Sequence, residues 1–231
     1  MGNEVALKKP QELSPYAAFA AEGEAQAIAG KLLVFSKGFW YSGQERDAVK
    51  TGKSFVCNMP EFYLGFVKWQ NQAPVDMRLE RLADRSPHTK PIFREDLGDN
   101  DPSLWDRDSN GKPRDPWQPT RRLVMRAYKA ADIDLYTFTT SSGGGQRALR
   151  KLCGEYEQMR RKHGADMLPV VTIGSESWQH KDKAIGMVQS PTFEVVGCTT
   201  WEPGGKVIKI EKDAPVTAAK IKEELDDEIP F

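Results

Sequence analysis

One strong amphipathic helix pattern stands among segments that are typical of β-strands, and this arrangement limits the fold more than any other feature. Between residues 146 and 163, apolar side chains recur at helical spacing: Leu149, Leu152, Cys153, Tyr156 and Met159. Gly164 follows at a position where glycine commonly ends a helix. The sequence therefore predicts a mainly β protein with one prominent helix.

Segments rich in β-branched and aromatic residues lie on both sides of the helix. They cover residues 31–41, 54–58, 63–69, 121–128, 133–139, 168–173, 184–188, 192–199 and 206–210. From residue 63 to residue 199 the order is three strands, the helix and further strands. This order is that of an OB-fold, a small β-barrel with its helix between strands 3 and 4, so we expect that fold.

A long polar stretch interrupts the predicted barrel. Between residues 74 and 120, Pro, Asp, Asn and Arg dominate and the apolar periodicity is lost. We expect an N-terminal arm over residues 1–30, with a weak Ala-rich helix, and an OB-fold-like domain over 31–210 that carries 74–120 as an insertion. A disordered acidic tail is expected over 211–231.

The strands at 121–128 and 133–139 form a predicted hairpin. Alternation places four residues of the first strand on one face, where they offer two cations and one aromatic ring: Arg122, Val124, Arg126 and Tyr128. If Tyr136 and Phe138 of the second strand lie beside Arg122 and Arg126, unpaired bases could stack there, each contributing ~1–3 kcal/mol. The alternative is that Tyr136 and Phe138 form a second layer of the core.

A Ser/Gly-rich segment, residues 141–145, precedes the helix. Gln146 and Arg147 follow its glycines, which departs from a phosphate-binding P-loop, so we interpret it as a flexible connection. We expect Arg147, Arg150 and Lys151 to steer DNA across it. Lys68, Trp69 and Lys129 complete the predicted nucleic-acid site.

The sequence predicts no catalytic residue, metal or cofactor. Residues 106–111 resemble the start of a calcium loop, but Trp117 occupies the position that needs a bidentate Glu. Three cysteines and three histidines are scattered, without the spacing of a zinc site or a disulfide framework. No apolar stretch approaches the ~20 residues that span a bilayer, so we expect a cytoplasmic protein without a membrane partner.

The zero net charge hides an uneven distribution. Residues 222–231 hold one Lys and five acidic residues, which leaves a surplus of four positive charges on the remaining chain. Ten Lys or Arg and four acidic residues lie between positions 121 and 162. A basic body with an acidic tail suits a protein that binds polyanions, although ordinary solvated charges would give the same composition.

The chain ends on acidic residues followed by an apolar tip: Asp226, Asp227, Glu228, Ile229, Pro230 and Phe231. This ending resembles the acidic C-terminal tail of bacterial and phage single-stranded DNA-binding proteins. The resemblance implies that the tail recruits replication, recombination and repair proteins, and that it competes with DNA for the basic groove. An ordinary solvated acidic terminus is the alternative.

We therefore expect a non-enzymatic, phage-type protein that coats single-stranded DNA. A DNA-processing enzyme, such as a nuclease or recombination factor, and a protein–protein adaptor are the rival interpretations. The sequence leaves open the oligomeric state, a homo-oligomer included, and the preference between DNA and RNA.

Overall fold

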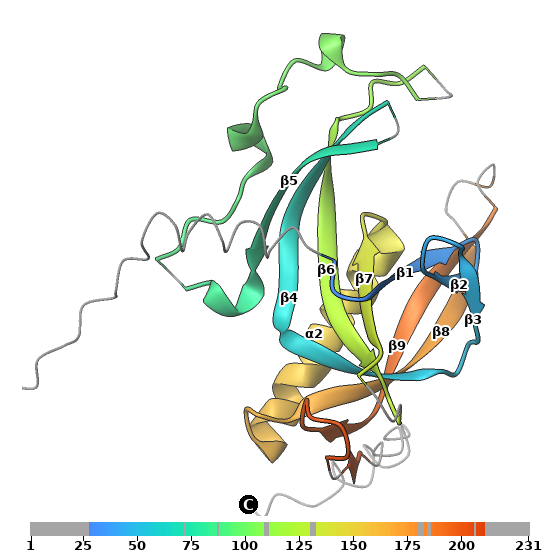
Figure 1. Cartoon of the computed structure of the whole chain (residues 1–231). Coiled ribbons are helices and arrows are strands. Elements are labelled where there is room, and N and C mark those ends of the chain that lie inside the picture. The colour runs from blue at the N-terminus through green and yellow to red at the C-terminus, as the bar shows by residue number, and fades with distance from the viewer. Residues whose placement is uncertain are drawn as a thin grey trace, which may run out of the picture.

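The computed structural model describes residues 28–210 apart from 72, 87, 109–110, 130–132, 180–182, 184–185 and 206. Residues 1–27 of the predicted arm and the whole predicted tail lie outside the described residues. The described chain is mainly β with one α-helix, α2, at Gly143–His163 (Figure 1). The strands are β1 Lys31–Ser36, β2 Phe39–Ser42, β3 Asp47–Val49, β4 Ser54–Gln70, β5 Ala73–Arg81, β6 Trp117–Ala127, β7 Leu135–Thr140, β8 Leu168–Gln179, β9 Met187–Thr199 and β10 Ile208–Lys209.

Strand β4 joins two segments that the sequence predicts as separate strands. Pro60 lacks the N–H that a sheet ladder needs, which suggested a break there. The chain instead continues through Pro60, and the register against β6 shifts between Asn58 and Phe62. An irregularity of this kind lets the strand continue although Pro60 donates no hydrogen bond to the ladder. Similarly, residues 187–188 at the end of the predicted strand 184–188 and the predicted strand 192–199 belong to one strand, β9, which runs through Pro191.

The insertion contains more regular structure than its composition indicates. Its first part is β5, which pairs antiparallel with β4. Three short 3₁₀ helices follow, at Leu82–Asp84, Arg94–Leu97 and Pro102–Leu104. Arg94 connects the segments around it, because its guanidinium donates to Asp115 Oδ2 at 2.7 Å, Gly98 O at 2.7 Å and Asn100 Oδ1 at 2.8 Å.

The described strands form one open sheet rather than the closed barrel that the sequence predicts. Their order is β10-β9-β8-β4-β6-β7-β1-β2-β3, with β5 on β4. Closure requires the ends of such a path to pair with each other. The free edge of β7 is instead occupied by β1, which pairs with it in parallel through Leu32↔Thr137 and Leu33↔Phe138.

The N-terminal hairpin of β1 and β2 contributes to the core. Trp40 of β2 is 1% exposed, and its Nε1 donates to Gly174 O of β8 at 2.9 Å. Its ring centroid lies 5.4 Å from that of Phe138 and 5.7 Å from that of Phe193. Because each fully buried large apolar side chain contributes about 1.5–3 kcal/mol, the hairpin is a structural part of the domain.

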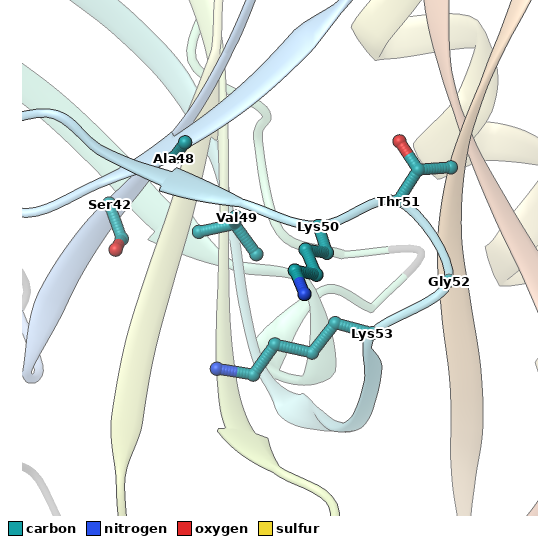
Figure 2. Close-up of a pocket in the computed structure, with 7 residues that line it drawn as sticks. All are labelled: Ser42, Ala48, Val49, Lys50, Thr51, Gly52 and Lys53. Carbon is teal, nitrogen blue, oxygen red and sulfur yellow. The ribbon is translucent and has the colours of Figure 1, made fainter.

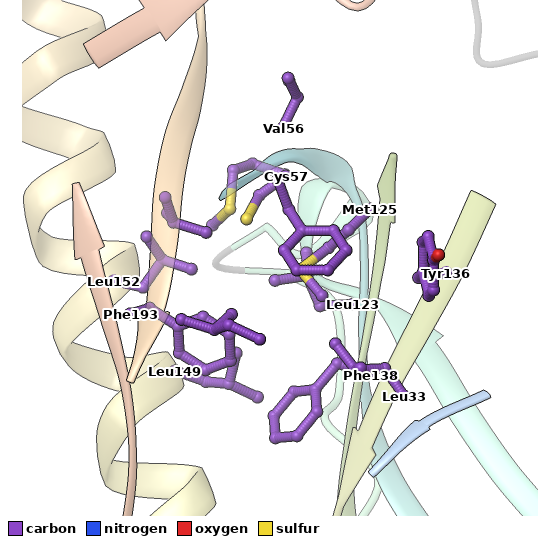
Figure 3. Close-up of a cluster of buried hydrophobic side chains, with 14 of the residues drawn as sticks. Leu33, Val56, Cys57, Leu123, Met125, Tyr136, Phe138, Leu149, Leu152 and Phe193 are labelled. Atoms are coloured by element: carbon purple, nitrogen blue, oxygen red, sulfur yellow. The ribbon is translucent and has the colours of Figure 1, made fainter. Parts of the chain in front are cut away.

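Helix α2 packs against β8 and β9 through the predicted apolar stripe. Leu149 and Leu152 point toward the buried side chains of the sheet, among them Phe193 (Figure 3). Ser142 caps the helix by accepting the Gly145 N–H at 3.1 Å. Gly145 also lies tightly against β7, since a Cβ there would be 2.2 Å from Thr140 Oγ1. The glycines therefore begin the helix, and do not form the flexible connection that we expected.

Within the part of the chain that the structure describes, no helix has both the length and the apolar character of a bilayer span.

Candidate nucleic-acid interface

The two arginines of the predicted binding strand are buried. Arg122 and Arg126 of β6 are only 3% and 4% exposed. Arg126 donates from Nε to Trp201 O at 2.6 Å and from Nη2 to Thr200 O and Glu202 O, each at 3.2 Å. Burial lowers the pKa of both guanidinium groups. The assignment of these residues to a phosphate-binding face is therefore corrected: Arg126 holds the loop after β9.

Tyr136 and Phe138 belong to the core, which corrects their assignment to a base-stacking platform. They are 3% and 1% exposed, and β7 aligns them with Met125 and Leu123 of β6. The residues of β7 that align with Arg122 and Arg126 are Thr139 and Leu135. The register of the hairpin thus selects the alternative in which both aromatic rings form a further layer of the core.

Lys68 and Trp69, at the end of β4, lie in an acidic environment. Lys68 Nζ is 2.9 Å from Asp99 Oδ2, and Trp117 Nε1 donates to the same oxygen at 3.0 Å. Hydrogen bonds from Lys68 and Trp117 lower the pKa of Asp99. Trp69 is 37% exposed and lines a pocket of about 510 Å³ that three carboxylates share: Asp99, Asp101 and Asp106. Since carboxylates repel phosphate, this pocket is a poor place for a DNA backbone.

Tyr128 and Lys129 lie at the start of the β6–β7 turn, which is only partly described. Tyr128 is half-buried and Lys129 is exposed. Lys129 Nζ lies 5.5 Å from the centroid of the Tyr128 ring. Lys129 therefore stays accessible to solvent, whereas Tyr128 packs partly against the core.

The helical cations come together as predicted. Arg147, Arg150 and Lys151 are exposed residues of α2, and their i, i+3, i+4 spacing places them on one side of the helix. Lys151 Nζ is 3.8 Å from Glu155 Oε1. Among the described residues, neither Arg147 nor Arg150 has an acidic side chain within ion-pair distance. The positive charge on this side of the helix is thus mostly uncompensated.

Two residues outside the prediction extend this surface. Arg121 of β6 lies near Arg150, since both line one pocket. Burial, followed by the positive charges of Arg85 and Arg150, lowers the pKa of the Arg121 guanidinium. Arg121 and Arg150 border a pocket of about 240 Å³ with an apolar floor. The Arg147 guanidinium lies 5.4 Å from the centroid of the Trp178 ring on β8. We call the following set the helix patch: Arg121, Arg147, Arg150, Lys151 and Trp178.

Trp178 links the helix patch to the tip of the N-terminal hairpin. Its Nε1 donates to Ser190 Oγ at 3.1 Å, and the adjacent Gln189 accepts a hydrogen bond from Ser177 at 2.9 Å. Gly38 lies against Gln189, since a Cβ at Gly38 would be 3.3 Å from Gln189 Cγ. Phe39, next to Gly38, is 65% exposed. Contacts through Ser190 and Gln189 therefore connect Trp178 to the β1–β2 turn, beside which Phe39 is exposed.

Local patterns explain why Arg121 and Trp178 were missed. Arg121 shares its strand face with Leu123, so alternation assigns it to the core. Trp178 lies in the polar second half of β8, beyond the apolar segment that predicts that strand. The feature of the sequence that could have indicated Trp178 as a site residue was the occurrence of a tryptophan within a polar stretch. For Arg121, the only signal was its place beside Arg122 at the end of the insertion.

Groups with reactive potential are dispersed. Among the described residues, no three His, Cys, Asp or Glu side chains are grouped to hold a metal ion. Cys57 and Cys198 are buried and Cys153 is partly buried, and burial raises the pKa of each thiol. A raised pKa disfavours the thiolate, which is the reactive form.

The predicted partner-binding residues, Asp226–Phe231, lie outside the described residues. No protein-family model matches the sequence, and neither a curated protein nor a solved structure matches the chain.

Proposed function

We propose that this chain binds single-stranded DNA through the helix patch and recruits DNA-processing proteins through its acidic segment. The observation that carries the proposal is the exposed row of Arg147, Arg150 and Lys151 on α2, with Arg121 and Trp178 beside it. The cations would contact phosphates. Trp178 and Phe39 would offer aromatic faces on which bases of any sequence can stack.

The order of the elements supports an OB-type core as part of this proposal. Five strands and the helix follow the chain as β4, β6, β7, α2, β8 and β9. Their lateral order, β9-β8-β4-β6-β7, places the first strand in the middle and the helix between strands three and four. In this proposal, β1 takes the edge at which an OB-fold would close.

The acidic segment 223–231 supplies the second half of the proposal. Its carboxylates and the apolar Ile229-Pro230-Phe231 tip suit a partner pocket with an apolar floor and a basic rim. Pro230 restricts the backbone on both sides of its amide, which reduces the entropy lost when Phe231 is held.

A charge-matched pair of variants tests the helix patch. Binding of fluorescein-labelled oligo-dT would be measured by anisotropy over a series of salt concentrations. Arg147→Gln/Arg150→Gln removes two predicted phosphate contacts. Because each contact to single-stranded DNA contributes about 0.7 to the slope of log K against log [salt], we expect that slope to fall by about 1.4.

The control is Arg160→Gln/Arg161→Gln, which makes the same change of charge in the last turn of α2, where both arginines lie near Glu157. We expect this control to bind like the wild type. Wild-type protein that does not bind oligo-dT contradicts the function. If the slope of log K against log [salt] for Arg147→Gln/Arg150→Gln equals that of the control, the location of the site is contradicted.

A protein–protein adaptor is the second candidate, favoured by the acidic pocket beside Trp69. Leu104, which lines that pocket, is 83% exposed, and Trp105 lines it as well. An apolar surface with carboxylates suits a basic protein segment better than DNA. An adaptor would leave the tryptophan fluorescence unchanged when poly-dT is added, whereas stacking on Trp178 would quench it.

A further inference from the structure

A second basic hollow lies outside the helix patch, beside β3, the last strand of the sheet path. It has a volume of about 500 Å³ and is formed by the β2–β3 hairpin and the turn at Lys50–Lys53. Both lysine side chains extend into the same space below the hairpin (Figure 2). No acidic residue is among those that line this hollow, whereas Ser42 and Thr51 are. We call it the lysine pocket.

The backbone beneath the lysine pocket is rigidly attached to β8. The Gly52 N–H donates to Ile173 O at 2.9 Å, and the Ile173 N–H donates to Lys53 O at 3.1 Å. The Lys53 N–H closes the turn on Lys50 O at 3.2 Å. The stems of both lysines therefore start from fixed points, which reduces the entropy lost when an anion is bound.

The Lys53 ammonium is oriented by its surroundings. Its Nζ donates to the Tyr136 hydroxyl at 3.0 Å and lies 4.7 Å from the centroid of that ring and 5.4 Å from that of Phe55. An ammonium has three donors, so Lys53 keeps two for a ligand. Lys50 is exposed, and among the described residues no carboxylate lies within ion-pair distance of it.

Asp134, a carboxylate that contacts this network, is already engaged. Asp134 accepts the Tyr136 hydroxyl at 2.7 Å and lies 3.7 Å from Lys31 Nζ. Asp134 thus lies next to Lys31, whereas Lys50 and Lys53 have no carboxylate within ion-pair distance among the described residues. Ammonium groups beside an open hollow match the oxygens of a phosphate group.

We propose that the lysine pocket binds a phosphate group of single-stranded DNA, as a contact separate from the helix patch. This inference rests on the proposed function. The two sites share no residue: Ser42 and residues 48–53 line the lysine pocket, and none of them belongs to the helix patch. A DNA strand that reaches both places would cover more nucleotides than one bound to the helix patch alone.

The first experiment detects the phosphate directly. Inorganic phosphate would be titrated into the full chain, and the backbone amide signals of residues 49–53 would be followed by NMR, with chloride at equal ionic strength as the reference. We expect saturable shifts that Lys50→Gln weakens at least threefold. Lys112→Gln, an exposed lysine of the insertion, is the matched control and should leave the titration unchanged.

The second experiment asks whether DNA supplies that phosphate. Lys50→Gln should lower the slope of log K against log [salt] for oligo-dT by about 0.7, and Lys50→Gln/Lys53→Gln by about 1.4. Lys50→Gln is the decisive variant, because Lys53 also supports Tyr136 and its replacement can disturb the fold.

The outcomes separate the two proposals. Phosphate-induced shifts without any oligo-dT binding contradict the proposed function, and they overturn DNA as the source of the phosphate. Oligo-dT binding with an unchanged slope for Lys50→Gln, or no phosphate-specific shifts at residues 49–53, overturns the lysine pocket and leaves the helix patch intact.

Discussion

At the scale of single residues, burial decides which polar groups are available for binding. Tyr136 illustrates this, because its ring is in the core while its hydroxyl connects Lys53 to Asp134. Burial, followed by the hydrogen bond and the charge of Asp134, raises the pKa of Tyr136 to about 12. A residue assigned to base stacking thus serves as a structural link beside the lysine pocket.

This link gives a testable dependence on pH. Below pH 10 the hydroxyl is protonated in both the folded and the unfolded chain. Between about pH 10 and 12 only the unfolded chain releases the proton, so wild-type stability falls by about 1.4 kcal/mol per pH unit from this group. Tyr136→Phe should be less stable than wild type by about 1–3 kcal/mol at pH 8, because Asp134 and Lys53 lose their partner.

Urea unfolding at pH 8, 10 and 11 checks the prediction. The difference in unfolding free energy between wild type and Tyr136→Phe should shrink as the pH rises above 10. Other tyrosines and lysines titrate alike in both proteins and cancel in the difference. A difference that stays constant over this range would contradict the assignment.

At the scale of elements, single side chains fix strands and loops to one another. Arg126 bridges β6 and the loop after β9 through three backbone carbonyls. Trp40 connects the N-terminal hairpin to β8 through one hydrogen bond, from its Nε1 to Gly174 O. Polar bonds of this kind specify an arrangement that apolar burial alone would leave less defined.

Arg126→Ala should therefore destabilise the fold by about 3 kcal/mol, because three carbonyls at residues 200–202 lose their charged donor and the packing of a buried side chain is lost. Chemical denaturation measures the loss. Arg161→Ala, an exposed arginine of α2, is the control and should change stability by less than about 0.5 kcal/mol. A loss for Arg126→Ala no larger than that of the control would show that Arg126 is dispensable for stability.

At the scale of the whole molecule, the proposal separates the DNA-binding body from the partner-binding segment. The described body carries the helix patch and the lysine pocket, and the acidic segment carries charge of the opposite sign. In this proposal, the segment and DNA compete for the same cations.

Removal of residues 223–231 should leave oligo-dT affinity equal to or above that of the full chain, because a competing polyanion is lost. Capture of DNA-processing proteins on DNA coated with the truncated protein should be abolished. Phe231→Ala should impair that capture alone, since every cation of the body remains. Loss of DNA binding in the truncated protein would contradict the model.

The sequence predicts much of the secondary structure but only part of the site. The stripe from Leu149 to Met159 identifies α2 because helical periodicity is local. Alternation in β6 also correctly separates Arg122 and Arg126 from Leu123 and Met125. It does not show whether the polar face is exposed, and that face is buried.

The sequence by itself determined the single helix of the described chain, the positions of most strand segments around it and the alternation of faces in β6, because these depend on neighbouring residues. Only the tertiary structure decided that β1 occupies the edge of β7, that Arg126 binds carbonyls 75 residues away, and that Arg121 joins the helical cations. Such contacts depend on how distant segments pack together, and local patterns carry no information about them.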